Sequence, residues 1–192
     1  MPISDGKQQE FIDASEITIG DTLYNCLWPI FQDYYNTGET PITKLAGRMV
    51  NSSQDAKELL NSCISGCKDN SLVGLISYAN ERISGFLFAT ISVGPSGVSE
   101  IAEIHYIHAA VHGSKMDEKD SQKRAESLQV TSALIAELCK KSGVEQVIIT
   151  ADGRHPEQNE LIAKYSFRPY GKNYQHICKA ASFSAGHQLW IW

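Results

Sequence analysis

The chain has 192 residues, of which 42% are hydrophobic and 20% are charged, and this length suffices to bury one good core. The formal net charge of −5 disfavours broad nucleic-acid binding, which requires neutralisation of phosphates. The first residues do not form a signal peptide, and no apolar run approaches the length of a membrane span. We therefore expect one cytoplasmic globular domain with neither nucleic acid nor a membrane as partner.

Three helical stretches are predicted in the first third of the chain, after a short strand at residues 10–14. The first covers residues 18–35, where Pro29 lacks an amide donor and can kink the helix. The second covers residues 42–49. The third covers residues 53–64, with Ser53 as the N-cap.

The next segment predicts an antiparallel meander. Residues 72–78 and 83–93 are rich in strand-forming side chains, and the polar turn Asn80-Glu81-Arg82 between them indicates a hairpin. A second turn at residues 94–97 contains two glycines and a proline, so a strand at 100–111 should continue the meander.

An amphipathic helix and a buried strand come next. Val130, Leu134 and Leu138 recur four residues apart, and Gly143 can take the left-handed conformation that ends a helix. The β-branched run at 147–150 predicts a strand at 145–151, parallel to the one at 100–111. A last helix at 156–167, stopped by Pro169, and one or two strands at 170–180 complete an α/β (α+β) fold.

Residues 122–127 combine small side chains and cations at the predicted start of the amphipathic helix. Free amides and the positive end of the helix dipole favour an anion there, and Ala125 and Ser127 are small enough to let it approach. Lys123 and Arg124 would add Coulomb attraction. The sequence thus predicts an anion site where strand ends meet a helix N-terminus.

Three motifs occur together in order: Ala102-Glu103-Ile104, then Gln122-x-x-Ala125-x-Ser127, then Tyr165-Ser166-Phe167-Arg168-Pro169-Tyr170. Together they resemble the GNAT family of N-acetyltransferases over residues 70–180. The resemblance implies a GNAT fold: a mixed central sheet, antiparallel in its N-terminal half, with a βαβ unit that binds acetyl-CoA and helices on both faces. Residues 1–192 would form one domain, with a cofactor-binding core at 70–180, a helical acceptor-side region at 10–69 and an aromatic tail at 181–192.

The resemblance also implies how acetyl-CoA is held. Backbone amides of residues 124–127 would bind its pyrophosphate, and the strand at 107–109 would hold the pantetheine arm. The residues expected to bind the cofactor are Ile107, His108, Ala109, Gln122, Lys123, Arg124, Ala125, Glu126, Ser127 and His155. Two departures stand out: Ala125 and Ser127 replace the family's glycines, and the charged loop at 111–121 is long, acting either as a lid or substrate contact or as a solvated loop.

Acetyl transfer to an amine needs a group that accepts the amine's proton. Glu103 is the candidate by chemistry and by its match to the glutamate base of the histone-acetyltransferase branch; the alternative is a glutamate on the solvent face of an edge strand. His105 is a backup base, because an imidazole titrates in the useful range, or else a structural histidine.

A general acid for the departing thiolate is harder to assign. Ile162 occupies the family's tyrosine position, His155 stands where many members have asparagine, and Ser166 replaces a glycine. Tyr165 is therefore proposed as the acid on chemical grounds alone, with a purely structural tyrosine as the alternative.

No metal site is expected. On a regular strand His105 and His108 point to opposite faces, so only His108 and His112 could converge, without a third ligand. The five cysteines form no Cys-x-x-Cys pair, and Cys63 and Cys67 are expected as reduced thiols on one helix face.

The functional prediction is an acetyl-CoA-dependent N-acetyltransferase that acts on a primary amine, in a small molecule or a peptide, by direct attack in a ternary complex. The alternatives are a non-catalytic acyl-CoA-binding module and, third, a protein-interaction domain using the aromatic tail. Leu189, Trp190, Ile191 and Trp192 are costly to leave in water. They should dock on the same subunit or exchange across a homodimer.

Overall fold

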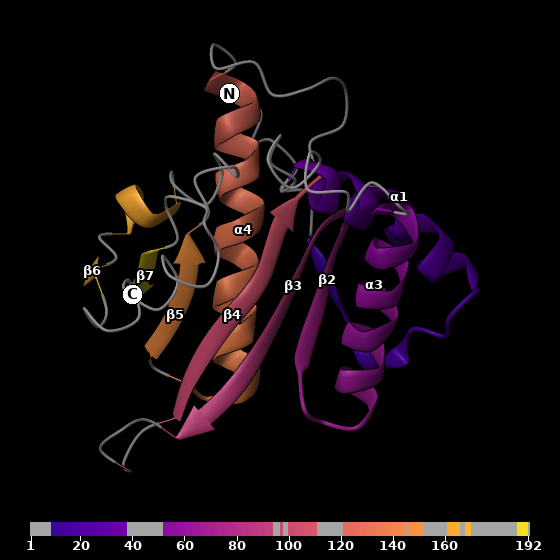
Figure 1. Cartoon of the computed structure of the whole chain (residues 1–192). Coiled ribbons are helices and arrows are strands. Elements are labelled where there is room, and N and C mark those ends of the chain that lie inside the picture. Colours follow the sequence, from indigo (N-terminus) through magenta and orange to yellow (C-terminus); the bar gives the residue numbers. More distant parts are fainter. Residues whose placement is uncertain are drawn as a thin grey trace.

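A single seven-stranded sheet organises the chain, in the strand order β1-β2-β3-β4-β5-β7-β6. The computed structural model describes residues 9–37, 52–93, 97, 100–110, 121–144, 146–151, 161–165, 168–169 and 188–191. The elements are β1 (Glu10–Asp13), the 3-10 helix η1 (Ala14–Glu16), α1 (Thr22–Thr37), α3 (Ser52–Lys68), β2 (Val73–Ala79), β3 (Arg82–Val93), β4 (Glu100–Ala109), α4 (Ser121–Ser142), β5 (Gln146–Ala151), β6 (Arg168–Pro169) and β7 (Gln188–Ile191). The long helix α4 covers one face of the sheet, and α1 and α3 cover the other (Figure 1).

The predicted antiparallel meander is confirmed, because β1 to β4 pair in sequence as antiparallel neighbours. Asn80 and Glu81 form the β2–β3 turn with φ values of 52° and 61°. Two successive left-handed residues match the right-handed twist of the strands that they join. A polar two-residue turn therefore sets this hairpin, as the sequence indicated.

The predicted parallel unit is also confirmed. β4 and β5 pair in parallel through Ile101–Ile104 and Gln146–Ile149, with α4 as their connection. Gly143 ends α4 with φ of 69°, and its amide donates to the carbonyl of Cys139 at 2.8 Å. This is the left-handed helix end expected from the sequence.

The helix boundaries differ from the prediction where capping residues decide them. α1 begins at Thr22, four residues later than expected, because the Asp21 carboxylate accepts a hydrogen bond from the Tyr24 amide at 2.6 Å. This bond, with a second from the Thr18 amide, holds the pKa of Asp21 below its ordinary value. α1 then continues through Pro29 as one helix. The helix predicted at 42–49 lies outside the described residues.

The C-terminal tail supplies a strand that the sequence analysis did not predict. β7 pairs antiparallel with both β5 and β6, so it lies between them in the sheet. The tail thus docks on its own chain through backbone pairing. Strands predicted at 170–180 lie outside the described residues, as does most of the helix predicted at 156–167, whose described part is helical at 161–164.

Two hydrophobic cores lie on the two faces of the sheet. The buried members of the first, here called the aliphatic core, join α4 to the sheet and to residues 161–162, and all of them are aliphatic. The second, here called the aromatic core, joins α1 and α3 to β2 and β3 and contains Tyr24, Phe31, Tyr34, Phe86 and Phe88. In the described part of the chain, no helix has the length and apolar composition of a membrane span.

Candidate active site

A β-bulge in β4 sets the geometry of the candidate site. Phe88 on β3 pairs with Tyr106 and Ala89 pairs with Ile104, so His105 is the extra residue. A bulge reverses the alternation of side chains beyond it. Ile104 and Ile107 consequently both belong to the aliphatic core although they are three residues apart.

The same bulge overturns the prediction that His105 and His108 point to opposite faces. The His108 ring lies 5.4 Å from that of Tyr34, a member of the aromatic core. The Nε2 atom of His105 lies 2.9 Å from Oγ1 of Thr90. Because Ala89 and Ile91 on either side of Thr90 pack with the aliphatic core, Thr90 points to the aromatic side. Both histidines thus reach the aromatic side of the sheet.

Glu103 lies on the same face, because it pairs directly opposite Thr90. Its side chain is half-buried, whereas that of His105 is exposed. The alternative for Glu103 was a position on the solvent face of an edge strand. β4 is instead the central strand of the seven-stranded sheet. Glu103, Thr90 and His105 therefore form a polar group on a central strand pair.

Aromatic rings border this polar group. The centroid of the Tyr106 ring lies 6.4 Å from that of the His105 ring and 6.3 Å from those of the Phe31 and Tyr34 rings. Burial, reinforced by nearby Cys63 and Tyr35, raises the pKa of Tyr106 above its ordinary value, so this phenol stays protonated near neutrality. Phe31 and Tyr34 of α1 are buried members of the aromatic core.

The start of α4 determines which backbone amides are free to bind an anion, and it lies earlier in the chain than the predicted anion-binding amides. α4 begins at Ser121, and only the amides of the N-cap residue and of the first three helical residues lack a partner within a helix. The amides of residues 124–127 are therefore bonded inside the helix, and the described amides left free for a pyrophosphate are those of residues 121–123. The physical reason is that Gln, Lys, Arg, Ala and Glu are strong helix formers, so the helix extends back over the motif.

The side chains of this segment divide into two groups. Lys123 and Arg124 are half-buried, whereas Gln122, Ala125 and Glu126 are exposed. Ser127 is only 2% exposed, and its carbonyl accepts a hydrogen bond from the Thr131 hydroxyl at 3.0 Å. The cations lie in the first turn, near the free amides of residues 121–123, while Ser127 belongs to the interior.

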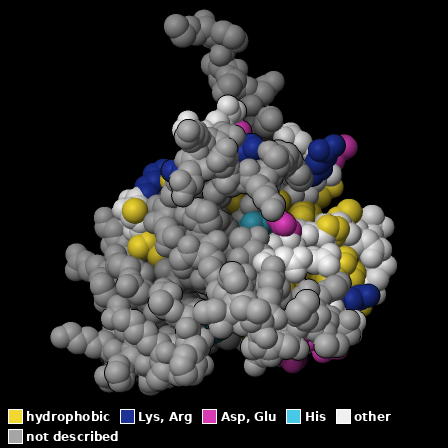
Figure 2. Space-filling view, turned by 45° about the horizontal axis from the view of Figure 1, so that its top comes forward, with side chains coloured by type: hydrophobic (Ala, Val, Ile, Leu, Met, Phe, Trp, Pro, Cys, Tyr) yellow, Lys and Arg dark blue, Asp and Glu magenta, His cyan; other side chains and the backbone are white. Residues whose placement is uncertain are grey.

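β4 and β5 diverge toward the end of the sheet where α4 begins (Figure 1). Their parallel register ends at Ile104 and Ile149, whereas β4 continues to Ala109 beside β3. Ile107, His108 and Ala109 thus occupy the diverging part of β4. In Figure 2, which brings this end forward, a histidine and an acidic side chain appear near the centre among hydrophobic groups, with basic side chains to either side.

Tyr165 lies on the other side of the sheet. It packs against the aliphatic core, in which its helical neighbour Ile162 is 8% exposed. The Lys164 ammonium lies 5.6 Å from the Tyr165 ring centroid. The structure therefore gives Tyr165 a packing role, and its role as an acid stays a prediction.

Several predicted residues lie outside the part of the chain that the structure describes, namely His112, His155, Ser166 and the loop at 111–120. Among the described residues, no three histidine, cysteine or acidic side chains gather as a metal site would require. Cys63 and Cys67 are free and buried in α3, as expected, and burial raises the pKa of each to about 12.

Sequence reasoning missed Thr90 and Tyr106. A polar residue inside the apolar run of β3 was the available signal for Thr90. For Tyr106 there was no comparable signal, because its position beside His105 on one face depends on the bulge.

The fold is that of the GNAT-family acetyltransferases, as the comparison with solved structures shows. A GNAT-family acetyltransferase from Staphylococcus aureus Mu50 matches with a TM-score of 0.51 and 8% identity, covering 96% of this chain and 98% of that one. No protein-family model matches the sequence, and neither does any curated protein. The predicted GNAT fold is confirmed by architecture, not by sequence identity.

Two further solved structures carry the cofactor. The PaiA N-acetyltransferase from Thermoplasma acidophilum, in complex with coenzyme A, matches with a TM-score of 0.54 and 13% identity over 96% of this chain and 98% of that one. The PseH N-acetyltransferase from Campylobacter jejuni, in complex with acetyl coenzyme A, matches with a TM-score of 0.54 and 9% identity over the same shares.

Proposed function

We propose that the protein transfers the acetyl group of acetyl-CoA to a primary amine by direct attack in a ternary complex. The observation that carries this proposal is Glu103, a half-buried carboxylate on β4 that lies beside the point where the parallel β4–β5 register ends. Solved structures of the same fold bind coenzyme A or acetyl coenzyme A, which supports acetyl-CoA as the co-substrate.

The cofactor would lie along the diverging strands, with its phosphates toward α4. The backbone of Ile107, His108 and Ala109 would hold the pantetheine arm and polarise the acetyl carbonyl. The first-turn amides of α4, together with Lys123 and Arg124, would hold the pyrophosphate, because the positive end of the helix dipole favours an anion there. Gln122, Ala125, Glu126 and His155 remain predicted neighbours of the cofactor.

The chemistry assigned to Glu103 is removal of a proton from the acceptor. Most free amines are protonated at neutral pH, and only the neutral amine can attack the thioester. The Glu103 carboxylate would accept that proton, directly or through water. Attack then forms a C–N bond to the acetyl carbon, and the C–S bond breaks to release coenzyme A as a thiolate, for which Tyr165 is the proposed proton donor.

Two measurements test the function. Mass spectrometry of the purified protein should detect co-bound coenzyme A, and isothermal calorimetry should detect binding of acetyl-CoA. A panel of an alkyl monoamine, a diamine, an aminoglycoside and a lysine-containing peptide should then show acceptor-dependent thiol release. Absence of both cofactor binding and thiol release would overturn the proposal.

The phosphate placement has its own test. Ser121→Pro removes one free amide at the first helical position, where proline is tolerated, and should weaken acetyl-CoA binding about tenfold, as expected for one lost charge-assisted hydrogen bond. Ser121→Ala keeps the amide and serves as the control. Equal affinity of the two variants in calorimetry would place the phosphates elsewhere.

The role of Glu103 is tested by Glu103→Gln, which preserves shape and removes the base. Turnover should fall roughly 10²–10⁴-fold, most strongly below the pKa of the amine, with acetyl-CoA affinity unchanged. Turnover equal to that of the wild type across the pH range would move the base elsewhere.

A non-catalytic acyl-CoA-binding module is the second candidate. It is favoured by one observation: Tyr165, the proposed acid, packs against the aliphatic core, while Ile162 occupies the family's tyrosine position. Acetyl-CoA binding in calorimetry without thiol release for any acceptor would select this candidate.

A further inference from the structure

The hydrogen bond between Thr90 and His105 has no role in the transfer described above. Thr90 lies between two titratable groups: it pairs opposite Glu103 across the β3–β4 ladder, and its hydroxyl lies 2.9 Å from Nε2 of His105. Opposite residues of an antiparallel pair have Cβ atoms roughly 4.5–5.5 Å apart on one face. A rotation of the Glu103 side chain can therefore bring its carboxyl group to the Thr90 hydroxyl.

Exposure increases along this row of groups. Glu103 and Thr90 are half-buried, and His105 is exposed. An acceptor and a cofactor seated over Glu103 would cover it further, and a carboxyl group that has taken a proton must lose it before the next turnover. The exposed ring of His105 can exchange protons with water directly.

We propose that Thr90 and His105 form the exit path for the proton that Glu103 removes from the amine. This inference rests on the proposed function. Thr90 is the positioning residue, because its hydroxyl both holds the His105 ring and bridges it to Glu103. His105 shares a face with Thr90 because it lies two residues beyond Glu103, which pairs opposite Thr90, and the bulge adds Tyr106 and His108 to that face.

The proton balance is complete without a further reactant. The O–H bond on protonated Glu103 breaks as its proton passes to Thr90 Oγ1, and the hydroxyl's own proton passes to Nε2 of neutral His105. The resulting imidazolium gives one ring proton to water. Exchange of the exposed ring with water restores the starting tautomer, and Glu103 is again a carboxylate.

Four variants test the path in the full-length protein with acetyl-CoA and the best acceptor of the amine panel. Thr90→Val keeps the shape of the side chain and removes the hydroxyl, and should lower kcat about tenfold with little change in KM. Thr90→Ser restores the hydroxyl and should restore kcat. His105→Ala should show the same loss as Thr90→Val, and added imidazole should recover it. Ser92→Ala removes an exposed hydroxyl two residues further along β3 and should leave kcat unchanged.

The double variant Thr90→Val/His105→Ala should be no slower than either single variant, because groups that act in one path are not additive. Wild-type kcat in both Thr90→Val and His105→Ala would overturn the exit path and leave the proposed function standing. Loss in His105→Ala without imidazole rescue, or loss in Thr90→Val that Thr90→Ser does not restore, would also overturn it. A wild-type protein that acetylates no amine would overturn the proposed function, and the exit path with it.

Discussion

The two faces of the sheet use different side chains for different purposes. Against α4, the buried members of the aliphatic core are all aliphatic, and the charged groups stay outside it. Against α1 and α3 lies the aromatic core. On the same face, β4 carries the half-buried side chains of Tyr106, His108 and Glu103 and the exposed side chain of His105. One bulge assigns the β4 side chains to these faces. The bulge thus places Ile107 in the aliphatic core and adds Tyr106 and His108 to the face that carries Glu103 and His105.

The comparison predicts that aromatic contacts contribute more stability than aliphatic ones of equal burial. Phe31 and Leu134 are both 0% exposed, but Phe31 also lies 5.2–6.4 Å from the rings of Tyr34, Phe86, Phe88 and Tyr106. Phe31→Ala should lower the free energy of unfolding by about 4 kcal/mol, because it leaves a cavity and also removes ring pairs.

The matched variant on the other face is Leu134→Ala, with an expected loss of about 3 kcal/mol. Urea denaturation of both variants measures the difference. A loss in Phe31→Ala equal to or below that in Leu134→Ala would remove the distinction between the two cores.

The next largest loss of stability is expected from adding a side chain at Gly85, where β3 lies close to β4 and α4. A Cβ added at Gly85 would lie 2.5 Å from the carbonyl oxygen of His108 and 2.7 Å from Cγ1 of Val130. Because the first neighbour is backbone, it cannot rotate away. Gly85→Ala should therefore cost about 2 kcal/mol of stability, seen as a lower urea midpoint with an unchanged slope. An unchanged midpoint would mean that α4 does not pack this tightly on β3.

How much of this could be predicted from sequence depends on how local the cause is. The hairpin at Asn80 and Glu81, the end of α4 at Gly143 and the parallel β4–α4–β5 unit follow from turn chemistry and hydrophobic periodicity, and each was predicted. The bulge at His105 was not, because it leaves no mark in the alternation of residues 100–111. The strand β7 was not predicted either, since its pairing with β5 joins segments about forty residues apart.

For the candidate site the same distinction holds. Glu103 was chosen from its chemistry and motif, and the structure places it on a central strand beside Thr90. The free amides of α4 were misplaced by a few residues, because helix propensity extended the helix to Ser121. Local patterns identified the residues, but the start of a helix and the face of a strand required tertiary structure.

A variant of Tyr165 tests whether a residue on the aliphatic face takes part in catalysis. Its contact with the aliphatic core suits packing, whereas a role as general acid predicts that Tyr165→Phe lowers turnover about tenfold with stability unchanged. Thiol-release kinetics and thermal unfolding measure the two properties in the same variant. Full turnover with cofactor affinity retained would leave Tyr165 as a structural residue only.

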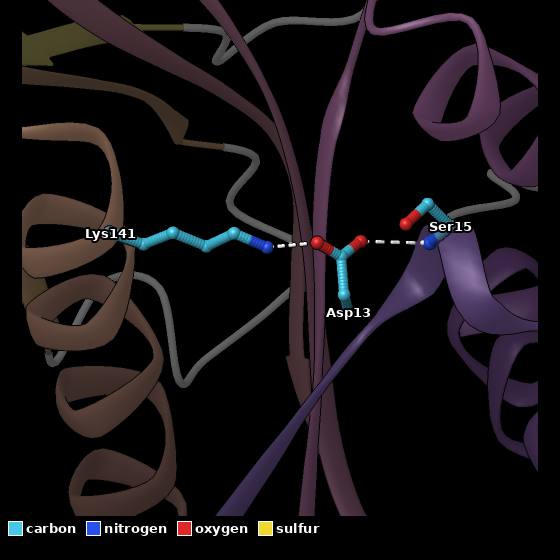
Figure 3. Close-up of polar contacts among 3 residues, drawn as sticks. All are labelled: Asp13, Ser15 and Lys141. Carbon is cyan, nitrogen blue, oxygen red and sulfur yellow. Dashed lines mark hydrogen bonds and ion pairs between the residues drawn. The ribbon is translucent and has the colours of Figure 1, made fainter.

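The smallest expected effect belongs to a link between the two faces. Lys141 in the last turn of α4 forms an ion pair with Asp13 at the end of β1, and the same carboxylate accepts a hydrogen bond from the Ser15 amide at 2.9 Å (Figure 3). Burial acts to raise the pKa of Asp13, but the bonds to Lys141 and Ser15 outweigh it and hold this pKa below its ordinary value.

The side chains of Lys141 and Asp13 are 39% and 29% exposed, so solvent screens the pair. Lys141→Met should therefore cost only about 0.5–1 kcal/mol at neutral pH. Because the folded-state pKa of Asp13 is lowered, its contribution is present above the unfolded-state value near 4 and is lost as pH falls through the folded-state value. The stability difference between Lys141→Met and the wild type should accordingly shrink below about pH 4. Lys140→Met is the matched control, since the Lys140 side chain is 80% exposed and its Nζ lies 3.7 Å from Oε2 of Glu137. An equal loss of stability in both variants, or a loss in Lys141→Met that does not depend on pH, would mean that the Asp13–Lys141 pair does not stabilise the fold.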